Sequence, residues 1–179
     1  VIEANDVAVP AGANITIVAH LKADGKPTLT PFVNDTSASD KGARLTVRHV
    51  AAAPAVDVRA GGAVAVPGLE NPKEAKLNIA AGMVAADVVA AGTDTVVLGP
   101  ADLDIKAGVN TIVYAWGSLE GDNLALATQT VKLTTGMPST GAEGPADTSF
   151  LTLAAASLMI AGVATTVVAA QRSRARSNS

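Results

Sequence analysis

Few residues of this 179-residue chain have types and spacing that support chemistry. There is no cysteine, so thiolate nucleophiles and thiolate metal ligands are excluded. The two histidines, His20 and His49, form no His-x-x-x-His pair, and neither a Gly-x-Ser-x-Gly turn nor a phosphate-binding glycine loop occurs. His49 alternates with apolar residues, which favours a hydrogen-bonded structural histidine over a base or ligand. The sequence predicts a non-enzymatic protein without cofactor or metal.

Three further residues are candidate ligand contacts. Asp102 and Asp104 would share one strand face, with carboxylates ~6.6 Å apart, and Asp94 could join them around calcium. Because the calcium loop pattern is absent, a solvated strand face is the default interpretation. Tyr114 and Trp116 are the only Tyr and Trp. We expect them on opposite faces of one strand, so that at most one is exposed. Core packing is the default for Trp116, and a sugar-stacking contact is the alternative.

The C-terminal part has four segments in a fixed order. Met137-Pro138-Ser139-Thr140-Gly141 is followed by a polar spacer from Ala142 to Ser149, and then by 21 uncharged residues from Phe150 to Ala170. As a helix, 150–170 would extend ~31 Å, the thickness of a bilayer core. We therefore expect a single transmembrane helix there. It is followed by a basic cytoplasmic tail, 171–179, whose stop-transfer arginines are Arg172, Arg174 and Arg176.

This order resembles the sortase sorting signal, whose usual pentapeptide is Leu-Pro-any-Thr-Gly. Pro138, Thr140 and Gly141 match, Ser139 occupies the free position, and Met137 replaces Leu. The resemblance implies that sortase cleaves after Thr140 and joins its carbonyl to an amine of the peptidoglycan precursor. A flexible linker, 134–149, would keep the motif accessible. A permanent single-pass membrane anchor with a Pro/Gly stalk remains the alternative.

Composition and charge restrict the rest of the chain. Hydrophobic residues make up 49% and aromatic residues 2%, so the core must be built from Val, Ile, Leu and Ala, which favours strands. All sixteen acidic residues and ten of the thirteen basic ones precede residue 148, giving 10 − 16 = −6 for this part. An acidic body argues against nucleic acid as a partner.

Short apolar runs separated by Gly, Pro, Asn and Asp predict an antiparallel β-sandwich, immunoglobulin-like or related. Leu45, Val47 and His49 share one face of a strand, whereas Arg44, Thr46 and Arg48 share the other, which we expect to be the solvated side. Asp57 and Arg59 are i, i+2 neighbours that could pair across a strand edge, which contributes little at a surface. Asp24-Gly25 predicts a hairpin turn. The expected strands are 14–21, 28–34, 43–51, 55–60, 63–66, 74–80, 83–90, 94–98, 101–106, 109–117 and 123–132.

The chain also repeats itself at an offset of 96 residues. Residues 9–19 resemble 105–115, and Asp6 and Gly25 correspond to Asp102 and Gly121. A recurring turn-then-strand pattern would explain this. Our preferred interpretation is tandem β domains. Residues 1–36 would then be the closing strands of a truncated upstream repeat, 43–133 a complete repeat, and 35–42 the boundary.

Residues 47–62, VRHVAAAPAVDVRAGG, carry a second resemblance. His49, Pro54 and Val56-Asp57-Val58 resemble the bacterial secreted domain of unknown function 4397 family. This implies a β-sandwich in envelope proteins and no assigned activity. The sequence thus predicts a structural or adhesive module on the surface of a Gram-positive-type bacterium, with sortase, peptidoglycan precursor and membrane as partners. The alternative is a module that binds glycan, peptide or calcium on a permanent anchor. The extracellular ligand is unknown in either case.

Overall fold

The structure is a computed structural model that describes residues 9–134. This part contains ten β-strands and no helix, as expected for an all-β fold. Accordingly, no helix long and apolar enough to cross a membrane is found among these residues. The strands are β1 (Ile15–Leu21), β2 (Pro27–Val33), β3 (Ala43–Ala52), β4 (Val56–Ala60), β5 (Ala63–Leu69), β6 (Glu74–Ile79), β7 (Gly82–Ala90), β8 (Val96–Ile105), β9 (Val109–Ser118) and β10 (Ala125–Lys132).

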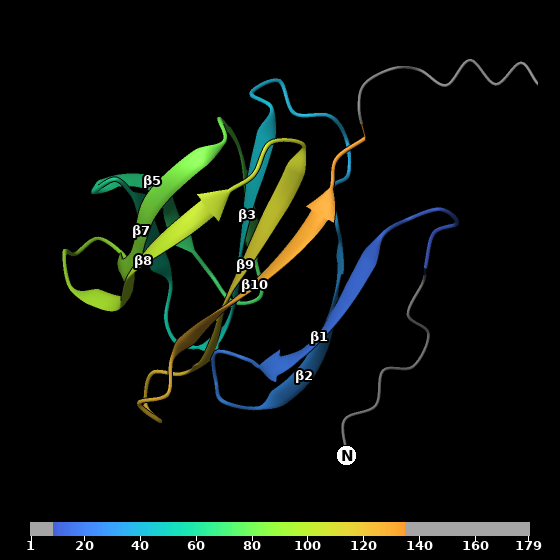
Figure 1. Ribbon diagram of the computed structural model, residues 1–179. Coiled ribbons are helices and arrows are strands. Elements are labelled where there is room, and N and C mark those ends of the chain that lie inside the picture. Colours follow the sequence, from blue (N-terminus) through green and yellow to red (C-terminus); the bar gives the residue numbers. More distant parts are fainter. Residues whose placement is uncertain (1–8, 135–179) are drawn as a thin grey trace, which may run out of the picture. The chain divides into compact units, whose positions relative to one another are not determined.

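The strands form a hairpin and two four-stranded sheets (Figure 1). The hairpin is β1–β2. One sheet, named here the β3 sheet, has the order β10-β9-β3-β6, and the other, the β7 sheet, has the order β5-β4-β7-β8. Every pairing is antiparallel except that of β3 with β9, which is parallel. The predicted sandwich architecture is therefore confirmed, with one parallel pair in an otherwise antiparallel arrangement.

The main core lies between the β3 sheet and the β7 sheet. Leu45 and Val47 of β3 and Val113 of β9 pack against Val58 of β4 and Ile105 of β8. These side chains are at most 5% exposed. They come from alternate positions of their strands, as expected when one face of a sheet is buried against another sheet. Their aliphatic character agrees with the low aromatic content of the sequence.

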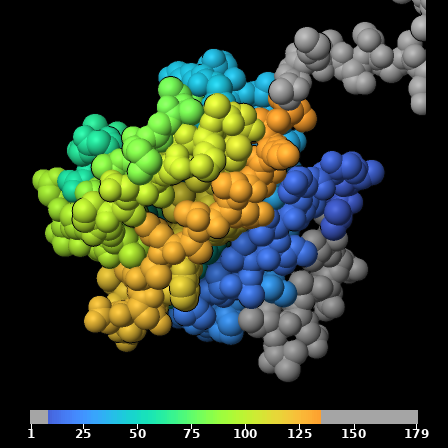
Figure 2. Space-filling model, viewed as in Figure 1, coloured from blue at the N-terminus to red at the C-terminus, as the bar shows by residue number. Residues whose placement is uncertain are grey.

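A second, smaller core lies on the opposite face of the β3 sheet, beneath the hairpin. Phe32 of β2 packs with Val50, Ile112, Tyr114 and Val131, and Val18 of β1 joins them. Figure 2 shows the hairpin, in blue, lying beside β10, in orange. The β3 sheet is therefore covered on both faces.

This covering corrects the expectation for β3. Arg44, Thr46 and Arg48 were expected on a solvated face, but they are 5%, 0% and 0% exposed, and all ten residues of β3 are buried. The alternation of polar and apolar residues is real, but the polar face meets the hairpin and the connection that follows it. The Arg44 guanidinium lies 2.9 Å from the Asp35 carboxylate and also donates to the Ser37 carbonyl. Polar side chains here fill an internal layer.

The strand boundaries follow the turn residues closely, with two differences. The expected strand 63–66 continues through Pro67-Gly68 to Leu69 in β5. The expected strands 94–98 and 101–106 form a single strand, β8, that passes through Gly99-Pro100. The pairing of β8 with β7 shifts in register near this point. β8 is an edge strand, where a proline without an N–H is tolerated. The Asp24-Gly25 turn is present, with Gly25 at φ +78°.

Several predictions fall on residues beyond this description. The sorting motif 137–141, the transmembrane helix 150–170 and the basic tail 171–179 lie outside the described residues. The division into an upstream repeat and a complete repeat also stays a prediction.

Candidate functional site

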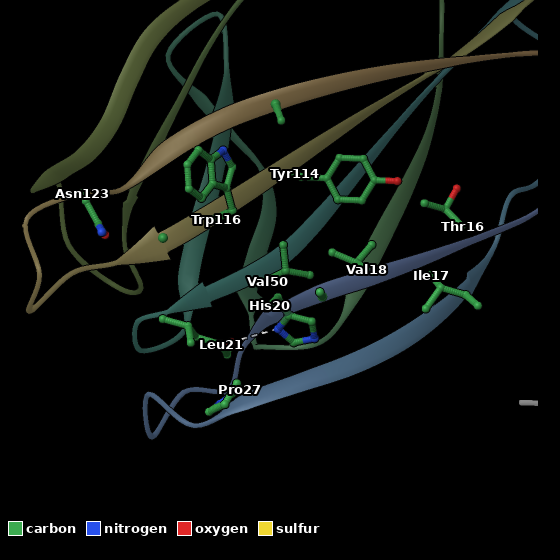
Figure 3. A pocket seen from close by; sticks show the side chains of 13 residues that line it. Thr16, Ile17, Val18, His20, Leu21, Pro27, Val50, Tyr114, Trp116 and Asn123 are labelled. Carbon is green, nitrogen blue, oxygen red and sulfur yellow. Dashed lines mark hydrogen bonds between the residues drawn. The ribbon is translucent and has the colours of Figure 1, made fainter. Parts of the chain in front are cut away.

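An open groove of about 670 Å³ lies between β1 and the end of β9 (Figure 3). We call it the Trp116 groove. One side is formed by β1, the other by Trp116 and the turn after β9, and the floor by β3 and β9. Its lining is largely apolar. The side chains used below are Val18, His20, Val50, Tyr114, Trp116 and Asn123.

Trp116 gives the groove its character. Its side chain is 47% exposed, whereas Tyr114 is 8% exposed. The two residues are two positions apart in one strand and therefore share a face, which corrects the expectation that they point to opposite faces. The expectation that at most one is exposed is confirmed. Trp116 is thus not a buried core residue, and it lines the groove.

His20 lies across the groove from Trp116 in Figure 3 but is committed to internal hydrogen bonds. Its Nδ1 is 2.9 Å from the Leu21 carbonyl oxygen, and its Nε2 is 2.8 Å from the Thr30 hydroxyl. With Nδ1–H donating to the carbonyl, Nε2 accepts from Thr30. The ring is 8% exposed. His20 therefore shapes the groove wall and has no free nitrogen for a substrate or a metal.

His49 is likewise structural. Its Nε2 lies 2.9 Å from the Pro54 carbonyl oxygen, and its Nδ1 accepts from the Ala51 N–H. Burial lowers the pKa of His49 below the usual 6.5, because the charged ring would lose its hydration. The hydrogen-bonded structural histidine expected from the sequence is present, and it is neutral at pH 7.

Arg48, which we expected on a solvated strand face, is buried and holds Tyr114 of the groove lining. Arg48 donates to the Glu74 carboxylate at 2.8 Å, to the Tyr114 hydroxyl at 2.7 Å and to Asn34 Oδ1 at 2.9 Å. Its guanidinium also stacks over the Phe32 ring, 4.4 Å from the centroid. Two arginines spaced by four residues on the same face of a strand whose other face is largely apolar were the available signal for such a polar layer.

The network continues through Tyr114 to the hairpin. The Tyr114 hydroxyl donates to Gln129 Oε1 at 2.6 Å, and the Gln129 side chain is 3.2 Å from the Thr16 hydroxyl of β1. A continuous series of hydrogen bonds therefore links β6, β3, β9, β10 and β1. Because buried polar groups hold their geometry when each is satisfied, this series fixes the hairpin relative to the β3 sheet and sets the width of the groove.

The predicted carboxylate contacts do not join the Trp116 groove. Asp102 and Asp104 are exposed residues of β8, and the Asp104 carboxylate pairs with Lys106 at 3.0 Å. Asp94 lies 3.4 Å from Arg59 instead. Among the residues that the structure describes, no group of three or more His, Asp or Glu side chains is placed to hold a metal ion. The solvated strand face is the interpretation that the geometry favours.

Asp57 of the Val-Asp-Val segment holds two turns together. Its carboxylate accepts from the Gly68 N–H at 2.6 Å and the Gly92 N–H at 2.9 Å, and these bonds lower the pKa of Asp57. Asp57 makes no pair with Arg59, which the sequence spacing would have allowed. Arg59 makes two 2.7 Å hydrogen bonds to Asp87, because Asp87 lies opposite it on β7.

These features define a β-sandwich module with an open, largely apolar groove. Most of the titratable side chains described above are engaged in internal hydrogen bonds or ion pairs. Comparison with known families finds a match for the N-terminal part of the chain. The family described as Domain of unknown function (DUF4397) matches residues 1–59, which include β1 to β3, His49 and the Val-Asp-Val segment. The match covers 59 of 179 residues and supports this domain family for that part of the chain. No curated protein and no solved structure matches the chain.

Proposed function

We propose that this chain is a non-enzymatic module of the bacterial cell surface that sortase joins to the cell wall through Thr140. The observation that carries this proposal is the order of four segments in the sequence: pentapeptide, polar spacer, 21 uncharged residues and arginines. An uncharged stretch of this length prefers the bilayer to water, and the arginines that follow resist translocation. The β-sandwich would then stand on the outer side of the membrane in a structural or adhesive role.

The described part of the chain supports a role without catalysis. A catalytic site usually gathers titratable groups of shifted pKa in a cleft. Here the shifted groups each have a structural cause: burial for His49, hydrogen bonds from loop or turn donors for Asp24, Asp35 and Asp57, and their mutual pair for Arg59 and Asp87. None of these residues lines the Trp116 groove. The groove thus offers contact surface, and His20 in its lining already has a hydrogen-bond partner at each ring nitrogen.

The test is mass spectrometry of protein released from the wall by a peptidoglycan hydrolase. We expect a C-terminal peptide that ends at Thr140 and carries a cell-wall peptide on its carbonyl. The matched variants are Thr140→Ala, which should abolish wall attachment, and Ser139→Ala, which changes the free position of the motif and should not. Mature surface protein that retains Arg172 to Ser179 would overturn sortase anchoring in favour of a permanent single-pass membrane anchor.

A second candidate function is ligand binding in the Trp116 groove, and the half-exposed indole favours it. Indole rings stack on sugar rings and on apolar peptide side chains. Trp116 is the only tryptophan, so its fluorescence reports directly on the groove. We would titrate soluble wall glycans and short peptides, using Leu119→Ala as the control variant because Leu119 is similarly exposed, at 45%. Saturable quenching that Trp116→Ala abolishes would support this function, and its absence across the glycans and peptides would reject it.

A further inference from the structure

The hairpin β1–β2 has an apolar outer face that nothing covers in the described part of the chain. Its inner face, which includes Val18, His20 and Phe32, packs on the β3 sheet. On the outer face no residue is buried, and Ile17 and Val33 are 50% and 52% exposed. Every residue of this face is apolar: Ile15, Ile17, Ala19 and Leu21 of β1, and Pro27, Leu29, Pro31 and Val33 of β2. A contiguous apolar sheet face that stays exposed is typical of a surface that a partner covers.

A second hairpin in the chain, β9–β10, has both a neighbouring strand, β3, and a covering sheet, the β7 sheet. At the 96-residue offset, β1 corresponds to β9, and β2 corresponds to β10. Gly12 and Gly108 precede the two hairpins with φ of +74° and +71°. Ile15 pairs with Val33, and the corresponding Thr111 pairs with Thr130 rather than Gln129, because the second turn is one residue longer. The sequence repeat is therefore also a repeat of backbone structure.

The two hairpins differ in what surrounds them. Val113 of β9 faces the β7 sheet and is 4% exposed, whereas Ile17, which corresponds to it, is 50% exposed. The edge of β9 away from β10 pairs in parallel with β3. The corresponding edge of β1 has no strand partner among the described residues, and it borders the Trp116 groove. Within residues 9–134, the first hairpin thus has neither a further neighbouring strand nor a sheet over its outer face.

We propose that a further copy of the segment 43–96, preceding β1 along the chain, completes this hairpin into a second sandwich. Its β3-like strand pairs in parallel with the open edge of β1 and enters the Trp116 groove. Its β4-like and β7-like strands cover the outer face of the hairpin. The tandem arrangement then places successive sandwiches in direct contact, since the inner face of one closing hairpin packs on the β3 sheet of the next repeat, as Phe32 and Val18 do here.

The size of the outer face favours a covalently joined partner over a second copy of this chain. Two strands of seven residues present roughly 24 Å by 10 Å, or about 240 Å², while a stable dimer buries about 800 Å² on each partner. A segment in the same chain does not lose the translational freedom that association costs. This proposal goes beyond wall anchoring and does not depend on it.

The experiment fuses a copy of residues 43–96 directly to Val1 of the full chain, reconstituted in lipid nanodiscs. The natural chain has no cysteine, so Ile17→Cys introduces a single thiol on the outer face. We expect this thiol to react with a water-soluble maleimide at least tenfold more slowly in the fusion than in the unfused chain. The copy contains no tryptophan, so a blue shift of Trp116 emission in the fusion reports separately that a strand has entered the groove.

Leu119→Cys is the matched control, because Leu119 is comparably exposed and belongs to neither the copy nor the hairpin. Its labelling rate should be the same in both chains. A second variant, Ile17→Asp, should shift the Tm of the unfused chain by less than about 3 °C and should remove the Trp116 blue shift in the fusion. Equal labelling of Ile17→Cys in both chains overturns the proposal, whether the appended copy folds elsewhere or stays unfolded. Wall attachment through Thr140 is measured separately, by mass spectrometry of wall-released protein. A protein that fails the labelling test but passes that one keeps its proposed function.

Discussion

Replacing Arg48 with methionine tests whether the buried polar layer holds the hairpin on the sandwich. Arg48 is 0% exposed and donates to three side chains, and methionine has no donor with which to replace these bonds. Asn34 Oδ1 would lose the donation from Arg48, at about 1–2 kcal/mol for a buried acceptor left unsatisfied. Loss of the guanidinium above Phe32 adds about 1 kcal/mol. The Glu74 carboxylate, whose side chain is 22% exposed, loses its partner at about 1–2 kcal/mol.

These contributions give an expected loss of about 3–5 kcal/mol in the free energy of unfolding, the range found when one member of a buried pair is removed. The assay is urea unfolding at pH 7 of a chain that ends at Met137, with linear extrapolation to water. The double variant Arg48→Met/Glu74→Leu should lose less than the single one, because no carboxylate is left without its partner. Lys132→Met, on the exposed side of β10, is the control and should change stability by less than about 0.5 kcal/mol. A loss below about 1 kcal/mol for Arg48→Met would refute the role given to this network.

Three further predictions concern other parts of the sandwich. The pKa of Asp57 lies below its usual 3.8 in the folded chain, so the unfolded chain binds more protons at low pH: the Asp57 contribution to stability, measured by urea unfolding across pH as the difference between the natural chain and Asp57→Asn, should be constant above about pH 5 and shrink below about pH 4. A difference that grows at low pH would contradict this. Gly117→Ala should lower the Tm by roughly 5–10 °C more than Gly12→Ala, because both glycines have positive φ but only at Gly117 would a Cβ overlap the Asn123 carbonyl oxygen. Equal Tm values would show that the 117–123 turn moves aside. Ile112→Ala should cost about 3 kcal/mol in urea unfolding, since Ile112 is 0% exposed beneath the hairpin, and a cost near zero would mean that the hairpin does not seal this core.

The strands could be predicted because turn residues mark their ends. Gly61-Gly62, Gly92 and Gly108 adopt positive φ in connections between strands, where glycine is favoured. The break expected at Gly99-Pro100 was wrong because an edge strand accommodates a proline at an irregularity in its pairing. A local sequence window contains no information on whether a strand lies at the edge or in the centre of its sheet.

The site was harder to predict, because it depends on contacts between distant segments. Alternation along β3 identified the two faces correctly but could not show that a hairpin from residues 15–33 covers the face with Arg44 and Arg48. Trp116 was among the predicted contacts, whereas the groove that makes it accessible is formed with β1, about 95 residues away in sequence. Asp102 and Asp104 had suitable spacing, but no third ligand is positioned beside them.

The parallel pairing of β3 with β9 has a consequence for the order of folding. Arg44 lies opposite Asn110, a separation of 110 − 44 = 66 residues, whereas Leu21 and Pro27 of the first hairpin are 6 residues apart. The difference in loop-closure entropy is about 2 kcal/mol. During synthesis β3 is complete before β9 has been made. The edge of β3 that pairs with β9 therefore stays unpaired until β9 is available. We therefore expect slow folding limited by this closure, and the cationic side chains of Arg44 and Arg48 would discourage a waiting β3 from pairing with another molecule.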